Sequence, residues 1–400
     1  MEICEKYDWL PVSSVAGQVN ESLLANARLV VTAPPGAGKS TLLPLSMLEG
    51  IGEGRILMLE PRRLAARQVA ERMASMLGET CGQTVGFRVR FETRVSSRTR
   101  VEVITEGILE RLLVSDPTLD GVAAVIFDEF HERSLASDTA LALTMEAQDV
   151  IRSDLRIVIM SATIDATDLC RRIGAPHIDI PGRMHDVGIV YGDDFDPRDC
   201  AAVTARAVCR AHREQRGDIL AFLPGQGEIA RCAELLGGSL SDTEIAPLYG
   251  MLSPEQQRKA MTPASGGRRR VVLATPVAET SLTIEGVSCV VDSGLCRAMR
   301  FDPSSGLSRL VTVPVSLDMA AQRSGRAGRL GPGVCYRLWS RAAEHRMREC
   351  REPEIMSADL APTRLGIAAW GESDPQRLPW ITPPPAGHWA HAASLLRGLG

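Results

Sequence analysis

The chain has 400 residues, of which 44% are hydrophobic and 24% are charged, and its formal net charge is −4. This composition excludes a disordered tail and is typical of a globular protein with room for two or three hydrophobic cores. The small net charge gives no general attraction to a polyanion, so any nucleic-acid surface has to be a local groove lined with arginine.

The ten cysteines form no C-x-x-C pair, and the sequence shows neither a signal peptide nor an apolar run of membrane length. We therefore expect buried, reduced thiols in a cytoplasmic protein, with no membrane partner. Disulfides and a metal cluster are not expected.

Short apolar runs alternate with helical stretches along the first part of the chain. The predicted strands are 28–33, 56–59, 101–104, 124–127 and 157–160. This alternation is typical of an α/β fold whose parallel sheet is covered by helices on both faces. We assign residues 1–180 to a first domain.

A glycine loop, Ala-Pro-Pro-Gly-Ala-Gly-Lys-Ser-Thr at 33–41, follows the first predicted strand and precedes a helical stretch. This context predicts a phosphate-binding loop, in which backbone N–H groups surround the phosphates, Lys39 spans the β- and γ-phosphates and Ser40 holds Mg²⁺. Lysine use supports the prediction, because only three of the 45 Lys+Arg residues are lysines and one of them is Lys39. The predicted nucleotide-binding residues of the loop are Gly36, Ala37, Gly38, Lys39, Ser40 and Thr41.

The strand predicted at 124–127 leads into Asp-Glu-Phe-His-Glu-Arg at 128–133. A carboxylate at a strand end near a phosphate loop can hold Mg²⁺ through water, and a second carboxylate can orient and deprotonate an attacking water. We assign the first role to Asp128 and the second to Glu129. The alternative is a helix N-cap followed by surface charge.

After residue 180 the alternation restarts, with strands predicted at 188–191, 219–223, 271–274, 289–292 and 334–338. This second α/β domain, 181–345, has no phosphate loop, and one explanation is that it faces the first domain across a shared nucleotide cleft. Prolines are frequent after residue 346, and helices are predicted at 357–370 and 386–399. We expect residues 346–400 to be the opening of a small helical domain that is incomplete here.

Residues 322–329, Gln-Arg-Ser-Gly-Arg-Ala-Gly-Arg, place arginines three apart with small residues between them. Two guanidinium groups can then project from one helix face, as arginine fingers on a transferring phosphoryl group require. The alternative is a basic patch that contacts RNA phosphates. Just before this motif, residues 301–306 and the alternation at 310–313 predict a β-hairpin.

Together these motifs resemble the DEAH-box RNA helicases, and within that family the bacterial HrpB-type branch. The resemblance covers about residues 15–370 and implies two tandem RecA-like P-loop NTPase domains, followed by the start of a winged-helix-like domain. It also implies ATP and Mg²⁺ as cofactors. The matching segments are 33–41, 60–66, 85–92, 105–107, 128–131, 161–163, 222–225, 274–281 and 322–329.

The resemblance implies an RNA-binding set that contacts the sugar-phosphate backbone and reads no base edges, so that binding is largely independent of sequence. This set is Arg62, Arg63 and Thr105 in the first domain and Thr275 in the second. The hairpin would be the wedge at the strand junction.

The resemblance also implies roles around the nucleotide. Arg72 would stack on the nucleobase, and Gln322 would help to place the attacking water. Arg326 and Arg329 would be the arginine fingers. The residues that would couple nucleotide state to domain closure are His131, Ser161 and Thr163.

Four positions depart from the family's pattern, namely Ala33, Phe130, Pro276 and Leu295. Pro276 lacks a side-chain amide and a backbone N–H in a loop expected to touch RNA. We expect an ATP-dependent RNA helicase that couples nucleoside triphosphate hydrolysis to translocation and unwinding. The alternatives are an RNA-stimulated NTPase that does not unwind and a DNA translocase of the same superfamily. The sequence names no protein partner.

Overall fold

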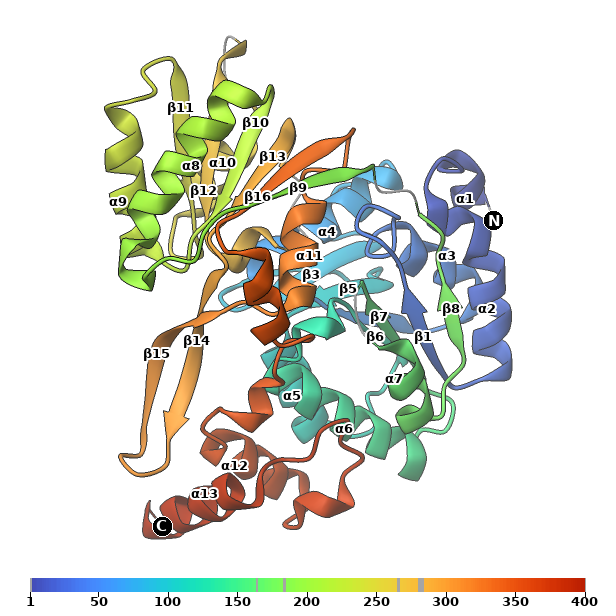
Figure 1. The fold of residues 1–400 in the computed structure, drawn as a ribbon. Helices are drawn as coiled ribbons and strands as arrows, with labels where there is room; N and C mark the ends of the chain where they lie inside the picture. The colour runs from blue at the N-terminus through green and yellow to red at the C-terminus, as the bar shows by residue number, and fades with distance from the viewer. Residues whose placement is uncertain (1, 163–164, 183–184, 265–266, 280–283, 400) are drawn as a thin grey trace. The chain divides into compact units, whose positions relative to one another are not determined.

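The computed structural model describes residues 2–162, 165–182, 185–264, 267–279 and 284–399. It divides into two compact units (Figure 1). The first unit comprises Met1–Gly182, Arg300–Ser308 and Glu352–Gly400, and the second comprises Arg183–Met299 and Arg309–Arg351. Most of the predicted third domain thus groups with the first unit. The three-domain division stays a prediction, because grouping by contacts does not decide which segments fold independently.

An eight-stranded sheet in the order β4-β3-β5-β2-β6-β7-β1-β8 forms the centre of the first unit. Every neighbouring pair is parallel except β3 and β4. All five predicted strands are present, as β1, β2, β5, β6 and β7, and prediction missed the other three. The bounds are β1 Arg28–Thr32, β2 Arg55–Leu59, β3 Val85–Val89, β4 Glu92–Arg94, β5 Val101–Ile104, β6 Val122–Phe127, β7 Arg156–Ser161 and β8 His177–Asp179.

Helices cover this sheet on two faces, as predicted (Figure 1). Leu29 and Val31 enter one core, while Val30 enters the other, because successive strand side chains point to opposite faces. The first core is covered by α1 Glu2–Lys6, α2 Ala16–Ala25, α3 Leu42–Gly50 and α4 Arg63–Met76. The second is covered by α5 Glu106–Ser115, α6 Leu135–Val150, α7 Ala166–Ile173, α12 Ala361–Trp370 and α13 Ala386–Leu399.

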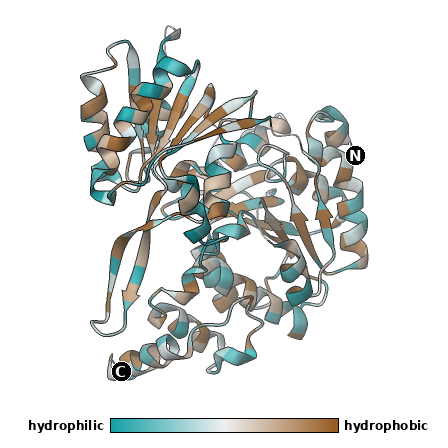
Figure 2. Ribbon diagram, viewed as in Figure 1, coloured by the Kyte–Doolittle hydropathy of each residue, from teal (hydrophilic) through white to brown (hydrophobic). Residues whose placement is uncertain are grey.

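A six-stranded parallel sheet in the order β11-β12-β10-β13-β16-β9 forms the centre of the second unit. The five predicted strands are again present, and only β11 was missed. The strands of the two sheets are mostly hydrophobic (Figure 2). The bounds are β9 Val187–Tyr191, β10 Asp218–Phe222, β11 Thr243–Leu248, β12 Arg269–Ala274, β13 Val287–Asp292 and β16 Gly333–Arg337, with helices α8 Cys200–Glu214, α9 Gln226–Gly237, α10 Pro254–Met261 and α11 Leu317–Gly325.

The predicted hairpin is confirmed and is longer than expected, with β14 Leu295–Asp302 paired to β15 Leu307–Pro314. Its tip, Arg300–Ser308, groups with the first unit. There the Phe301 N–H donates to the Ser357 carbonyl at 2.8 Å, and the Phe301 ring lies 6.1 and 5.4 Å from the rings of His388 and His391. Arg300 forms an ion pair with Glu352. The tip is therefore held by backbone and side-chain contacts with the C-terminal helical segment.

Among the described residues, no helix combines the length and apolarity that a bilayer span requires. Five cysteines are buried, at positions 200, 232, 289, 296 and 335. Cys350 is exposed, so the expectation of buried thiols is wrong at that position.

Candidate active site

The loop between β1 and α3 presents a row of backbone donors. The N–H groups of Gly36, Gly38, Lys39 and Ser40 donate no hydrogen bond to any residue that the structure describes. Gly36 and Gly38 adopt φ values of 86° and 90°, a left-handed backbone of the kind that forms anion-binding concavities. Because the row stands at the N-terminus of a helix, it can bind a phosphate group.

The loop is anchored from two sides. The Val12 N–H donates to the Ala37 carbonyl at 3.0 Å, and the Ala33 N–H donates to the Ser161 carbonyl at 3.1 Å. A Cβ added at Gly38 would lie 2.9 Å from Val12 Cγ1. Ala33 does not adopt a positive φ, so alanine fits where the family pattern has glycine. This departure leaves the loop intact.

Lys39 is buried against the two carboxylates assigned from the sequence. Its Nζ lies 3.0 Å from Asp128 Oδ1 and 2.7 Å from Glu129 Oε1. Burial by itself would lower the pKa of Lys39, but attraction to the two carboxylates outweighs burial and keeps the pKa above its usual value. Burial raises the pKa of Asp128, Lys39 lowers it and Glu129 raises it, and the result lies above the ordinary value. The structure thus brings the predicted phosphate lysine, metal ligand and base together.

The turn after β6 aims these carboxylates at the loop. The Asp128 N–H continues the sheet by donating to the Leu59 carbonyl at 3.0 Å. Glu129 then leaves the strand with φ 51° and ψ 33°, a left-handed conformation that costs about 1–3 kcal/mol in a residue other than glycine. The Glu129 carbonyl accepts from the Glu132 N–H at 2.9 Å and opens the 3₁₀ helix η2, Phe130–Glu132. A strained backbone therefore positions the predicted base.

His131 connects this turn to β7. Its Nδ1 lies 3.5 Å from the Ala162 N–H nitrogen and from Ser161 Oγ, and its Nε2 lies 3.4 Å from Glu129 Oε2. These contacts connect the turn that carries Glu129 to the end of β7. The coupling roles of His131 and Ser161 stay predictions. Thr163 lies outside the described residues.

The RNA set of the first unit follows two neighbouring strands. Arg62 follows β2 and Thr105 follows β5, and Leu59 pairs with Ile104 at the ends of these strands. Arg62 Nη2 lies 3.1 Å from Glu132 Oε1. Arg63 is exposed and donates to the Arg90 carbonyl at 2.7 Å. These groups share the carboxyl edge of the sheet, where ligands of such sheets bind.

Arg72, the predicted nucleobase contact, lies on α4 and is exposed. Within the described part of the chain, no contact joins it to the phosphate-binding loop. Its role stays a prediction.

In the second unit a buried arginine and one of the predicted fingers share a partner, Glu279. Arg323 is fully buried, with Nε 2.6 Å from Glu279 Oε1 and Nη1 2.7 Å from Asp292 Oδ1. Burial alone would lower the pKa of Arg323, but attraction to the two carboxylates outweighs burial and keeps the pKa above its usual value. Glu279 also pairs with Arg351 at 3.0 Å, and its carbonyl accepts from Arg326 Nε at 2.9 Å. Glu279 therefore ties three arginines together.

Sequence reasoning assigned no role to Glu279, Asp292, Arg323 or Arg351. Glu279 and Arg323 lie inside two segments that match the family, 274–281 and 322–329. Their opposite charges within one predicted domain were the signal that could have suggested an ion pair. Gln322 and Arg326 are buried, and Arg329 is half-buried. The structure places these three at one end of α11 without testing their roles.

The remaining departures have structural accounts. Pro276 is the first residue of the 3₁₀ helix η5, Pro276–Ala278, where an N–H would have no partner inside the helix. Phe130 is buried and lies edge-on to Phe127, with ring centroids 6.4 Å apart. Leu295 is buried in the core of the second unit, and its carbonyl accepts from Arg323. Thr275, predicted to bind RNA, directly follows β12.

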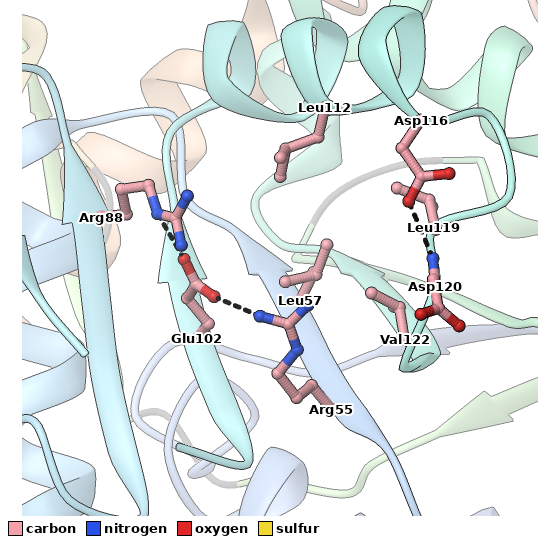
Figure 3. A pocket seen from close by; sticks show the side chains of 9 residues that line it. All are labelled: Arg55, Leu57, Arg88, Glu102, Leu112, Asp116, Leu119, Asp120 and Val122. Atoms are coloured by element: carbon pink, nitrogen blue, oxygen red, sulfur yellow. Dashed lines mark hydrogen bonds and ion pairs between the residues drawn. The ribbon is translucent and has the colours of Figure 1, made fainter. Parts of the chain in front are cut away.

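A separate cavity of about 100 Å³ lies at the amino ends of β2, β5 and β6 (Figure 3). Glu102 is buried there and bridges Arg55 at 3.4 Å and Arg88 at 2.8 Å. Asp116 accepts from the Asp120 N–H at 3.0 Å. Glu102 thus pairs with both arginines of the cavity, and the lining includes none of the predicted site residues.

Two family models match the chain. The DEAD/DEAH box helicase model matches residues 13–170, and the helicase conserved C-terminal domain matches residues 203–331. The chain therefore contains a DEAD/DEAH box helicase domain and a helicase conserved C-terminal domain, as the resemblance predicted.

Among known proteins, the chain is similar to "ATP-dependent RNA helicase HrpB" of Escherichia coli, with 46% identity over 98% of this chain and 49% of that protein. The crystal structure of that helicase matches with a TM-score of 0.92, covering 98% of this chain and 50% of the other. "Pre-mRNA-splicing factor ATP-dependent RNA helicase prp22" of Schizosaccharomyces pombe is 37% identical over 96% of this chain and 34% of that protein. The chain therefore spans about half the length of HrpB and about a third of the length of prp22.

Glu106, directly after Thr105, is a buried acid with a raised pKa. Ser134 Oγ donates to Glu106 Oε1 at 2.6 Å. Burial raises the pKa of Glu106 to about 7, the Ser134 hydrogen bond opposes this, and the negative charges of Glu132, Glu354 and Glu110 add to it. The folded state therefore binds this proton more tightly than the unfolded chain does.

We predict that Glu106→Gln stabilises the protein at alkaline pH. The stability from the bound proton is complete below the ordinary pKa of 4.5 and is lost as the pH rises through about 7. At about pH 8 the wild type has to ionise a buried acid, so the amide gains on the order of 2–3 kcal/mol, and the gain shrinks toward pH 5. Thermal unfolding at both pH values measures this, with Glu21→Gln on exposed surface as the control. A gain that does not change with pH would contradict the prediction.

Proposed function

We propose that this chain is an ATP-dependent RNA helicase motor, which couples nucleoside triphosphate hydrolysis to movement along RNA and to unwinding. The observation that carries the proposal is the buried Lys39 ammonium, held by Asp128 and Glu129 beside a row of backbone donors that have no hydrogen-bond partner among the described residues. HrpB and prp22 are named as ATP-dependent RNA helicases, which supports ATP and RNA as the ligands of this chain.

Bound triphosphate would supply the negative charge that the carboxylates supply now. The γ-phosphate would attract Lys39 away from Glu129, and Glu129 could then accept a proton from the attacking water. His131, whose Nε2 lies 3.4 Å from Glu129 Oε2, would hold that second oxygen of Glu129 in place. The step that binds nucleotide thereby also releases the base.

Mg²⁺ fits the residues that are present. Asp128 Oδ2 is buried and has no partner of hydrogen-bonding geometry among the described residues, although Ser40 lies near enough to lower the pKa of Asp128. A hard cation prefers such oxygen ligands. Ser40 and Asp128 would hold the ion, which would neutralise charge on the phosphates.

The remaining roles are proposals that rest on the family. Arg72 would stack on the base and Gln322 would help to place the attacking water, while Arg326 and Arg329 would be arginine fingers. The backbone of RNA would be held by Arg62, Arg63, Thr105 and Thr275. Ser161 and Thr163 would couple nucleotide state to closure, and a cytoplasmic location remains the expectation.

The direct test compares ATP hydrolysis without nucleic acid, with single-stranded RNA and with single-stranded DNA. We expect RNA to stimulate hydrolysis and DNA to do so less, and we expect a tailed RNA duplex to be unwound. Stimulation without unwinding would support an RNA-dependent NTPase instead. Preferential stimulation by DNA would support a DNA translocase.

We predict that Lys39→Ala and Glu129→Gln fail at different steps. The alanine removes a charged phosphate ligand, so nucleotide affinity falls by about tenfold or more. The glutamine keeps the size but loses the base, so nucleotide still binds while kcat falls by about 10²–10⁴. Nucleotide binding and turnover measure the two effects, and thermal unfolding checks that Lys39→Ala folds with its two carboxylates unpaired. Equal losses of nucleotide affinity in the two variants would contradict the assignment of Glu129 as the base.

We predict that Arg326→Ala and Arg329→Ala lower kcat by about 10³-fold or more while nucleotide affinity changes only a few-fold, because fingers act on the transition state. The control is Arg213→Ala, on the exposed surface of α8. Steady-state kinetics together with nucleotide binding separate the two quantities. Parallel losses of kcat and affinity would indicate that these arginines hold the ground state.

A further inference from the structure

We propose that Glu132 is a positioning residue through which bound RNA controls the hydrolysis site. Without RNA, Glu132 holds Arg62, and an RNA phosphate takes Arg62 away from it. The released Glu132 then shifts the turn that carries Glu129. This inference rests on the proposed function, because it needs RNA at Arg62 and hydrolysis at Glu129.

The first step is the ion pair itself. Arg62 Nη2 and Glu132 Oε1 are 3.1 Å apart, and the two side chains are 19% and 12% exposed. Partial burial makes such a pair stronger than one on the open surface. The remaining exposure leaves the guanidinium within reach of a ligand from solvent.

The second step is the backbone connection from Glu132 to the predicted base. The two residues belong to one turn, closed by the hydrogen bond from the Glu132 N–H to the Glu129 carbonyl at 2.9 Å. The turn is bounded by Glu129 and Arg133, with φ values of 51° and 48°. Such left-handed residues persist only where their surroundings hold them. The tie to Arg62 is one of these restraints, so its loss changes the balance at Glu129.

The third step is competition. A phosphate and a carboxylate present similar paired oxygens to a guanidinium, so an RNA phosphate can replace Glu132 at Arg62. Glu132 would then lose a positive neighbour while it remains near Glu106, the buried acid whose pKa its charge helps to raise. Repulsion between Glu132 and the ionised form of Glu106 favours movement of Glu132 away from that acid. RNA binding at one strand end thereby acts on the catalytic turn at the next.

Arg63 provides a matched control. It adjoins Arg62 and is also predicted to bind RNA, but its guanidinium donates to the Arg90 carbonyl instead of to the turn. Loss of Arg63 should weaken RNA binding without interrupting the proposed connection. Arg62 and Arg63 therefore separate RNA affinity from RNA control.

The experiment measures RNA dissociation constants at fixed salt and ATP hydrolysis with and without saturating oligouridylate. For Glu132→Gln we expect RNA binding up to about fivefold tighter, because a competitor for Arg62 is weakened. We expect the ratio of RNA-stimulated to basal hydrolysis to fall to about one. Arg63→Ala should bind RNA more weakly and keep the wild-type ratio at saturation.

Arg62→Gln keeps the test decisive if Glu132→Gln unfolds. Arg62→Gln should also lose stimulation at saturating RNA. If the double variant Arg62→Gln/Glu132→Gln folds, its ratio of RNA-stimulated to basal hydrolysis should be no lower than that of either single variant. Either of two results would overturn this inference and leave the proposed function standing. One is a wild-type ratio of RNA-stimulated to basal hydrolysis in either single variant, and the other is weaker RNA binding by folded Glu132→Gln. Wild-type hydrolysis that does not respond to RNA would overturn the proposed function as well.

Discussion

A buried ammonium shared by two carboxylates is the interaction on which the first unit depends. Taking charged groups out of water is costly, and the attraction between Lys39 and its two carboxylates offsets that cost. The three side chains arrive from the phosphate loop and the end of β6, two sheet positions apart in the order β6-β7-β1. Their mutual attraction holds the ammonium and the carboxylate oxygens side by side at the carboxyl edge of the sheet.

The second unit solves a similar problem with arginine. Arg323 is buried between Glu279 and Asp292 and lies 4.9 Å from the Phe222 ring centroid, so its charge is neutralised and its flat face is packed. This arrangement fixes α11, the helix that carries the predicted fingers at its end. Lysine could not make the same contacts, because it has no planar fork. The two units therefore use different cations for binding and for scaffolding.

Much of the fold followed from the sequence because central parallel strands are continuous apolar runs. The missed strands lack that signal, since β4 is Glu-Thr-Arg, β8 has three residues and β11 contains Pro247 at the edge of its sheet. The site residues around Lys39 were found because each lies in a motif at a strand end. The Arg62–Glu132 pair and the contacts of His131 with β7 could not be found, because they depend on partners that only the folded chain brings together.

The scarcity of lysine has a practical consequence. Only Lys6, Lys39 and Lys259 carry ε-amines, and the first and last are exposed while Lys39 is 5% exposed. Acylating reagents attack neutral, accessible amines, and Lys39 is neither, because its ion pairs keep it protonated. Mild acylation would therefore label two surface side chains and spare the third. Acylation of the Lys39 ε-amine would therefore show that the ion pairs at the phosphate loop have opened.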